Sequence, residues 1–152
     1  MKMLVCVSAK QHTSDVVTFA CRLARESASE VIILHVQPGS WSHSKGYLEE
    51  REKEGLSATF AAFPDHLGQF FEVPCRHMAD AGVKVRPRQA ESDDPAACIL
   101  RVAEEEDVDL IVCGATVHRM VERLFQPSIT ARLIRKSSRP VLVVPHPGES
   151  DD

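Results

Sequence analysis

Five cysteines and seven histidines are the residues of this 152-residue chain best suited to bind a metal or to act as nucleophiles. The cysteines are spread widely and form no C-x-x-C pair, and no two histidines stand at ligand spacing with a third donor nearby. A structural metal is therefore not expected. The cysteines are Cys6, Cys21, Cys75, Cys98 and Cys113.

Cys75 is the candidate for a reactive thiol. Arg76 and His77 follow it directly, and neighbouring positive charge stabilises a thiolate. Cys6 and Cys113 lie instead inside apolar runs, where cysteine behaves as a small hydrophobic residue. A redox-responsive adaptor acting through Cys75 is kept as a third hypothesis, behind the two developed below.

Catalytic side chains do not assemble into a motif. The chain contains no Ser-His-Asp order, no paired carboxylates and no metal triad, and the sequence locates no partner for Ser8. We therefore predict that the protein is not an enzyme.

The segment 114–139 has a charge opposite to that of the whole chain. It holds six basic residues and one acid, a charge of +5, whereas the chain as a whole carries −4. A basic segment around a helix N-terminus attracts phosphate. A solvated helix face is the more common explanation and is favoured; a weak anion or nucleotide site on Arg119, Arg123 and Ser128 is the alternative. The basic residues are Arg119, Arg123, Arg132, Arg135, Lys136 and Arg139.

Five short apolar segments rich in β-branched residues are predicted to be strands, at 3–7, 31–36, 83–88, 110–113 and 141–144. Helical periodicity lies between them around 16–24, 96–103 and 129–134, and the acidic stretch before Pro95 is expected to cap the second of these helices. This alternation predicts an α/β fold, an open five-stranded parallel sheet with helices on both faces, Rossmann-like. We expect one domain, 1–146, and a disordered acidic tail, 147–152.

Two parts of this pattern are irregular. Residues 38–80 begin with low hydrophobicity, and Pro64 and Pro74 are each expected to break or kink a helix, so a mobile loop followed by two helical pieces is predicted. The acidic run 104–107 lies at the C-terminal end of its predicted helix, where the negative end of the helix dipole disfavours acids, and is interpreted as a solvated terminus.

Composition excludes several classes of protein. Apolar residues make up 43% and charged residues 26%, as in soluble globular domains. No apolar run approaches the roughly 20 residues that span a bilayer, the net charge has the wrong sign for coating nucleic acid, and the first residues turn polar too soon for a secretory signal. We expect a cytoplasmic protein that binds neither membranes nor nucleic acid.

Ligands of such sheets bind at the carboxyl ends of the strands, near the point where the strand order reverses. The positions to inspect are therefore Ser8, Val36 with Gln37, and Gly114 onward. Residues 82–85, 93–100, 108–114 and 128–145 resemble the universal stress protein family in order, spacing and identity.

The resemblance implies a nucleotide site that this sequence has altered. Nucleotide-binding members carry Gly-x-x-Gly, nine residues, then Gly followed by Ser or Thr, whose backbone N–H groups cradle phosphates. They also carry an aspartate at the end of the first strand and an apolar residue near the adenine. The matching residues here are Gly114, Val117, Pro127 and Ser128 for the loop, Ser8 for the aspartate, and Val36 for the apolar residue.

These changes weaken phosphate binding. Pro127 has no N–H to donate, and Val117 would be strained in a left-handed conformation. Each lost hydrogen bond to a charged group costs about 1.5–3 kcal/mol, so two or three losses weaken affinity by about a thousandfold or more. We predict no tight ATP binding, with Gly114 as a turn glycine and Ser128 as a helix-start hydroxyl.

The last apolar segment, 141–144, invites another chain if it lies at a sheet edge. The resemblance implies a homodimer in which these strands pair across a two-fold axis, with Val141, Leu142, Val143 and Val144 at the interface; an ordinary inner strand is the alternative. The sequence thus predicts a stress-response protein that acts as a homodimeric interaction or regulatory module, without a cofactor and with an unidentified protein partner.

The alternative function is an adenine-nucleotide sensor that binds ATP or AMP through a degenerate phosphate loop. Its site would comprise Ser8, Val36, Gly114, Val117, Arg119, Pro127 and Ser128.

Overall fold

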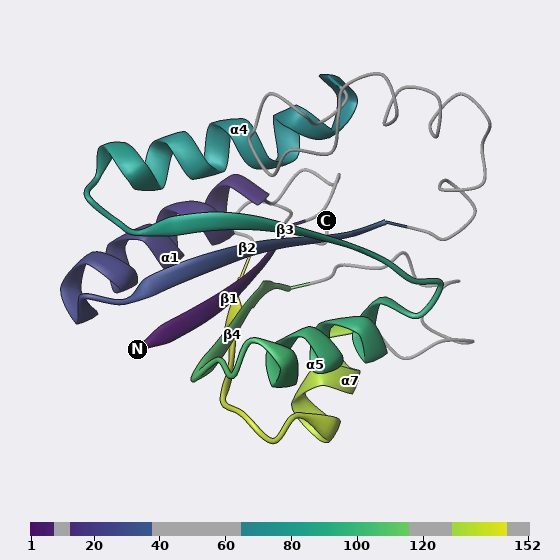
Figure 1. Ribbon diagram of the computed structural model, residues 1–152. Helices are drawn as coiled ribbons and strands as arrows, with labels where there is room; N and C mark the ends of the chain where they lie inside the picture. The colour runs from purple at the N-terminus through teal and green to yellow at the C-terminus, as the bar shows by residue number, and fades with distance from the viewer. Residues whose placement is uncertain (8–12, 38–64, 116–128, 146–152) are drawn as a thin grey trace, which may run out of the picture.

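Alternating strands and helices build the molecule, as a computed structural model that describes residues 1–7, 13–37, 65–115 and 129–145 shows. The predicted loop and first helical piece within 38–64, and the tail 147–152, lie outside these residues. The elements in chain order are β1 (Lys2–Val7), α1 (Thr13–Ser27), β2 (Glu30–Gln37), α4 (Asp65–Asp80), β3 (Val85–Glu91), α5 (Pro95–Glu105), β4 (Leu110–Gly114), α7 (Ile129–Lys136) and β5 (Val141–Val144) (Figure 1).

The strands form one sheet in the order β3-β2-β1-β4-β5, and every neighbouring pair is parallel. Val5 of the central strand stands beside Ile33 of β2 on one side and Val112 of β4 on the other. The predicted five-stranded parallel sheet is confirmed. The strand order reverses between β1 and β4, so the carboxyl ends of these two strands mark the place where ligands of such folds bind.

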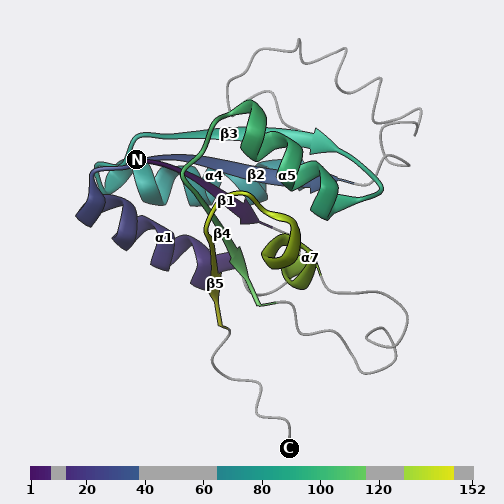
Figure 2. The same ribbon diagram turned by 90° about the horizontal axis from the view of Figure 1, so that it is seen from below.

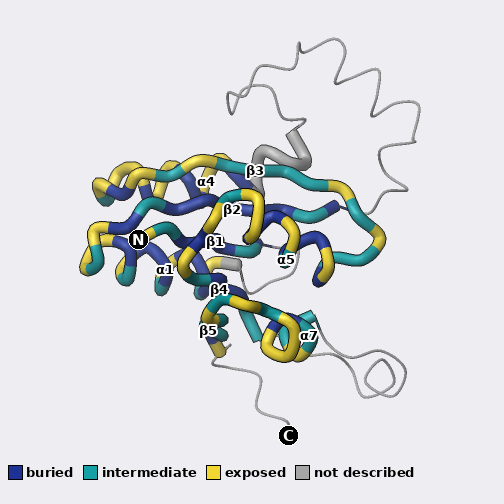
Figure 3. Tube along the Cα trace, turned by 60° about the horizontal axis from the view of Figure 1, so that its bottom comes forward, coloured by how far each residue is buried: buried dark blue, intermediate teal, exposed yellow. Residues whose placement is uncertain are grey.

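Helices cover both faces of the sheet, because successive strand residues point to opposite sides and both sides are apolar. Met3 and Val5 belong to the core beneath α1 and α4, and Leu4 belongs to the core beneath α5 and α7. Figures 1 and 2 show these two pairs of helices on opposite sides of the strands, and Figure 3 shows the buried middle strands between more exposed helices.

The third strand begins two residues later than predicted, at Val85. Gly82, with φ +81°, ends α4 in a left-handed turn, and the N–H of Val83 donates to the carbonyl of Met78 at 2.9 Å. Val83 is therefore buried in the turn that closes the helix rather than in the sheet.

Of the two predicted effects of Pro74, to break or to kink a helix, the break does not occur, because Pro74 lies inside the continuous helix α4. Phe71, Cys75 and Met78 on either side of it are buried against the sheet. The burial of this face holds the helix together despite the hydrogen bond that proline removes.

Residue Asp94 caps α5 as the acidic stretch predicted. Its carboxylate accepts a hydrogen bond from the N–H of Ala97 at 3.2 Å, and Pro95 occupies the first turn, where its missing N–H costs nothing. None of the described helices is long and apolar enough to cross a membrane.

Candidate functional site

The candidate site lies where β1, β2 and β4 end, and two of its predicted residues, Val36 and Gly114, are described. Ser8, Val117, Arg119, Pro127 and Ser128, together with Arg123, lie outside the described residues and stay predictions. We call the region around Val36 and Gly114 the carboxyl-end site.

Gly114, the last residue of β4, is held from two sides. Its carbonyl accepts a hydrogen bond from the Thr130 hydroxyl at 3.1 Å, which fixes the first turn of α7 against the end of β4. A Cβ added at Gly114 would stand 3.0 Å from Cγ2 of Val16 on α1. Glycine at this position therefore lets α1 approach the strand end closely.

Val36 is half-buried and packs in the core beneath α5 and α7. Gln37, next to it, is buried; its backbone carbonyl accepts from the N–H of Ser92 at 2.9 Å, and its side-chain oxygen accepts from the Gln89 amide. The Nε2 of Gln37 is buried and has no hydrogen-bond partner among the described residues. The turn from β3 to α5 is thus tied to the end of β2.

His35 joins the ends of β1 and β2 on the opposite face. Its Nδ1 lies 3.3 Å from the carbonyl of Val7, and its ring meets Phe71 edge-on, with centroids 6.1 Å apart. Burial lowers the pKa of His35, which favours the neutral ring that donates to that carbonyl. Histidine spacing in the sequence bears only on metal binding, so it gave no signal that His35 would bridge the ends of β1 and β2.

Asp94 and Arg132 form a two-pronged ion pair that the sequence did not indicate. Oδ1 and Oδ2 of Asp94 accept from Nη1 and Nη2 of Arg132 at 2.7 and 2.9 Å. Through hydrogen bonds, chiefly from Arg132 and then from the Ala97 N–H, the pKa of Asp94 is lowered to about 2. The pair connects the start of α5 to α7.

Residues 104–107 are exposed except for the half-buried Glu106, as a solvated terminus requires, but all four also form ion pairs. Glu106 pairs with Arg86 and Arg88 of β3, the latter at 2.6 Å, and Glu105 also pairs with Arg88. Glu104 and Asp107 lie 2.6 and 3.2 Å from the guanidinium of Arg139, which precedes β5. Cations from two other elements thus offset the acidic run at the negative pole of α5.

Ion pairs also engage part of the basic segment 114–139. Among its four described cations, Arg132 and Arg139 are engaged by carboxylates, while Arg135 and Lys136 are exposed in the last turn of α7. The favoured solvated-face interpretation is therefore wrong for Arg132 and Arg139.

The structure contradicts a reactive Cys75. Its side chain is 2% exposed, and burial raises the pKa of the thiol to about 12. Arg76 points outward and pairs with Glu72 at 2.6 Å instead of stabilising a thiolate. Burial likewise raises the thiol pKa values of Cys6, Cys98 and Cys113 on the other face. Within the described ranges, no group of histidine, cysteine or carboxylate side chains is placed to hold a metal ion.

The two edges of the sheet differ in their free backbone groups. The N–H of Ile111 donates to the carbonyl of Pro140 at 3.0 Å, and the N–H of Ala115 donates to that of Val144 at 2.9 Å. In a parallel pair, every second residue of a strand bonds to its neighbour and the residues between face the other way. The N–H and C=O groups of Val141 and Val143 are therefore turned away from β4. The inner-strand alternative for β5 is therefore wrong. At the opposite edge, the N–H of Val31 donates to the carbonyl of Lys84, and the N–H of Ser92 donates to that of Gln37. By the same alternation, Pro87 of β3 faces outward from the sheet, where it has no N–H to offer.

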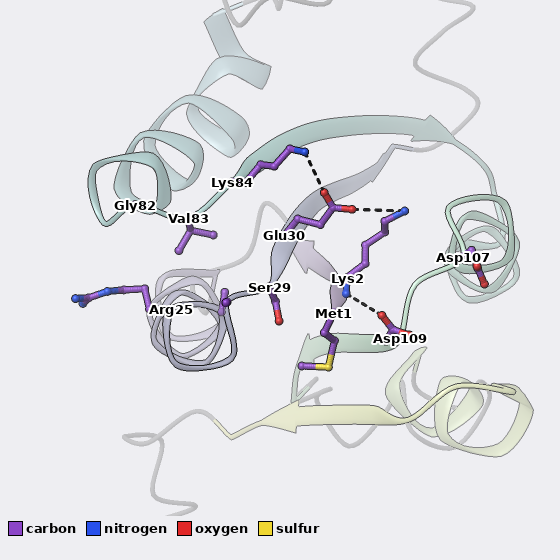
Figure 4. Close-up of a pocket in the computed structure, with 12 residues that line it drawn as sticks. Met1, Lys2, Arg25, Ser29, Glu30, Gly82, Val83, Lys84, Asp107 and Asp109 are labelled. Atoms are coloured by element: carbon purple, nitrogen blue, oxygen red, sulfur yellow. Dashed lines mark hydrogen bonds and ion pairs between the residues drawn. The ribbon is translucent and has the colours of Figure 1, made fainter.

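A groove of about 700 Å³ lies at the amino ends of the strands, far along the sheet from the carboxyl-end site (Figure 4). Three of its charged residues are held by contacts within the groove: Glu30 lies 3.6 Å from Lys2 and 3.4 Å from Lys84, and the backbone N–H of Lys2 also donates to Asp109 at 2.8 Å. This groove brings none of the predicted site residues together.

Comparison with known proteins gives consistent relatives. The model of the universal stress protein family matches residues 1–145. Universal stress protein MJ0531 of Methanocaldococcus jannaschii is 27% identical over 157 residues, covering 96% of this chain and 82% of that protein. Universal stress protein MJ0577 of the same organism is 33% identical over 137 residues, covering 77% of each.

Solved structures share the fold. The structure of MJ0577 matches with a TM-score of 0.72 at 25% identity over 97% of both chains. A universal stress protein in complex with cAMP matches with 0.68 at 19% identity over 95% of both chains. The universal stress protein from Archaeoglobus fulgidus in complex with dAMP matches with 0.65 at 20% identity, covering 95% of this chain and 97% of that one.

Proposed function

Because the chain belongs to the universal stress protein family, we propose that it acts in the cytoplasm as a homodimeric interaction and regulatory module of a stress response, without tight ATP binding. In this proposal two copies pair through β5 across a two-fold axis. The module performs no catalysis and presents its joined surface to a protein partner.

The difference between the two edges of the sheet is the main support for this proposal. The outward groups of Val141 and Val143 on β5 are available to a further strand, and this apolar strand carries neither a proline nor a charge to discourage pairing. At the other edge Pro87 interrupts the row of donors, and Arg86 and Arg88 flank it. A second copy of the same strand satisfies the β5 edge reciprocally, as two-fold symmetry requires.

Sedimentation velocity of Val143→Pro tests the dimer. The N–H of Val143 faces away from β4, so proline removes an outward donor without removing a bond inside the sheet, as Pro87 does naturally on β3. We expect a folded monomer where the unaltered protein is a dimer. Val143→Asp, which places a charge at the same position, gives the same result.

Val73→Asp is the matched control. Val73 is 66% exposed on α4, away from β5, and the substitution introduces the same charge in place of the same side chain. This variant stays dimeric. A monomeric unaltered protein, or folded Val143 variants that both remain dimers, would place the interface elsewhere or remove it.

A weak adenine-ligand site is the second candidate function, favoured by the placement of Gly114 at the switch point, of Val36 near the end of the neighbouring strand β2, and of α7 against Gly114. Structural neighbours in complex with cAMP and dAMP support it. The phosphate loop lacks a donor at Pro127, Val117 would be strained in the left-handed conformation that glycine adopts, and Ser8 replaces an acid, so affinity for ATP is expected to be low.

Calorimetric titration with ATP and magnesium separates these two functions. We expect weak or undetectable binding, and a dissociation constant in the low micromolar range would overturn the proposal of a module without tight ATP binding. The triple variant Ser8→Asp, Val117→Gly, Pro127→Gly is expected to gain affinity. An unchanged affinity would contradict the account of the loop.

A further inference from the structure

The ion pair between Asp94 and Arg132 stands beside the carboxyl-end site. Asp94 belongs to the turn whose Ser92 N–H is bonded to the last residue of β2, Gln37. Arg132 belongs to α7, whose Thr130 is bonded to the last residue of β4, Gly114. The pair therefore bridges the two elements that flank the ends of β2 and β4, on the same face of the sheet as Val36.

The pair fills the donors that a phosphate would use. A guanidinium offers a planar fork that fits a carboxylate or a phosphate through two parallel hydrogen bonds. Both Nη atoms of Arg132 are directed at Asp94, at 2.7 and 2.9 Å. Asp94 is fixed in place a second time as the cap of α5, through the N–H of Ala97.

We propose that Asp94 is a built-in anion that occupies Arg132 at the rim of the carboxyl-end site and thereby makes this site select adenine ligands of low phosphate charge, nucleosides and monophosphates, over ATP. An incoming triphosphate finds the guanidinium already neutralised and a fixed negative charge beside it. An uncharged nucleoside is not affected. This inference rests on the second proposed function, the weak adenine site.

Asp94→Asn is the decisive variant because asparagine also caps helices well, so the start of α5 is preserved while the charge is removed. Adenosine and ATP are each titrated calorimetrically at low ionic strength, where charge effects are not screened. We expect the ratio of ATP affinity to adenosine affinity to rise about tenfold, since a freed guanidinium forms charge-assisted bonds to phosphate. The affinity for adenosine itself stays the same.

Two further variants make the test specific. Glu104→Gln removes the same charge from the other end of α5, where it leaves Arg139 paired with Asp107 alone, and is expected to leave the ratio unchanged. The double variant Asp94→Asn, Arg132→Gln is expected to return the ratio to that of the unaltered protein. Thermal unfolding of each variant checks that it is folded.

The outcomes separate the inference from the function on which it rests. If Asp94→Asn is folded and binds adenosine but leaves the ratio of ATP affinity to adenosine affinity unchanged, the proposed role of Asp94 is wrong while the adenine site stands. An equal rise in Glu104→Gln also overturns it, because net charge would then be responsible. Failure of the unaltered protein to bind adenosine at millimolar concentration overturns the adenine site and the inference together.

Discussion

Leu133 and Ile134 are neighbours in α7 with opposite surroundings. The side chain of Leu133 is fully buried in the core beneath α5 and α7, whereas Ile134 is 59% exposed. Leu133→Ala leaves a cavity and is expected to lower the free energy of unfolding by about 2–5 kcal/mol. Ile134→Ala, its matched control, is expected to change it by about 0.5 kcal/mol. Urea unfolding measures both, and equal effects would contradict the described orientation of α7.

Cys75 offers a second test at the scale of single residues. Because it is buried and its thiol pKa is raised to about 12, we expect iodoacetamide to leave it unlabelled in the native protein at neutral pH and to label it in urea. Mass spectrometry of the peptide that contains Cys75 measures this. Native labelling as fast as in urea would revive the redox hypothesis.

The reactive-thiol hypothesis for Cys75 fails for a simple physical reason. Adjacent residues of a helix point about 100° apart, since 3.6 residues complete a turn. Arg76 can therefore face Glu72 in solvent while Cys75 faces the core. Nearness in the sequence gave the wrong neighbours for this thiol, and spacing of three or four residues would have given the right ones.

Helix α5 is fastened at both ends by ion pairs, and these pairs set its response to acid. Arg86 and Arg88 lower the pKa of Glu106, and Arg132 with Ala97 lowers the pKa of Asp94 from 3.8 to about 2. Carboxylates with lowered folded pKa values stabilise the protein above their unfolded pKa values and lose this contribution as pH falls through the folded ones. We expect stability to fall as the pH decreases from about 4.5 towards 2.

Glu106→Gln isolates the contribution of one pair. The variant is expected to be less stable at pH 7 and to lose less stability on acidification than the unaltered protein, as thermal unfolding across this pH range would show. Glu72→Gln is the control, because Glu72 is 52% exposed on the outer side of α4 and its pair with Arg76 is local. A Glu106→Gln variant with an unchanged acid response would contradict the assignment.

Elements were predictable to different degrees for identifiable reasons. The runs at 31–36 and 141–144 indicated strands because a parallel sheet covered on both faces requires continuous apolar residues. The path of α4 through Pro74 was not predictable, since it depends on how Phe71 and Met78 pack on the sheet. The partners of residues 104–107 were equally hidden, because Arg86 and Arg139 come from strands and turns that only the fold brings to α5.

At the scale of the whole molecule, the sheet that the described residues form has one protected and one open edge. Pro87 interrupts β3, while β5 turns the backbone groups of Val141 and Val143 outward. Pairing through a single open edge ends with two copies, so a closed dimer is expected rather than a filament. The alternation of elements predicted the five-stranded parallel sheet but not the order of its strands, which places Gly114 at the switch point and Val36 near the end of the neighbouring strand β2.

The carboxyl-end site was less predictable than the fold that carries it. Val36 and Gly114 were found from their positions at strand ends, but Asp94 and Arg132 stand 38 residues apart, and no local pattern links them. The net charge of −4 was a poor guide as well, because Arg132 and Arg139 are neutralised by acids from another helix and turn. Long-range pairing of charges requires the fold.

Hydrogen exchange at the backbone amides of β5 tests the dimer most directly. The amide of Leu142 is directed at β4 and is protected in any assembly, whereas those of Val141 and Val143 are directed outward. We predict that all three exchange slowly in concentrated protein and that dilution releases Val141 and Val143 alone. If Val141 and Val143 exchange as fast as open amides in concentrated protein while Leu142 stays protected, β5 is a bare edge and the proposed dimer is wrong.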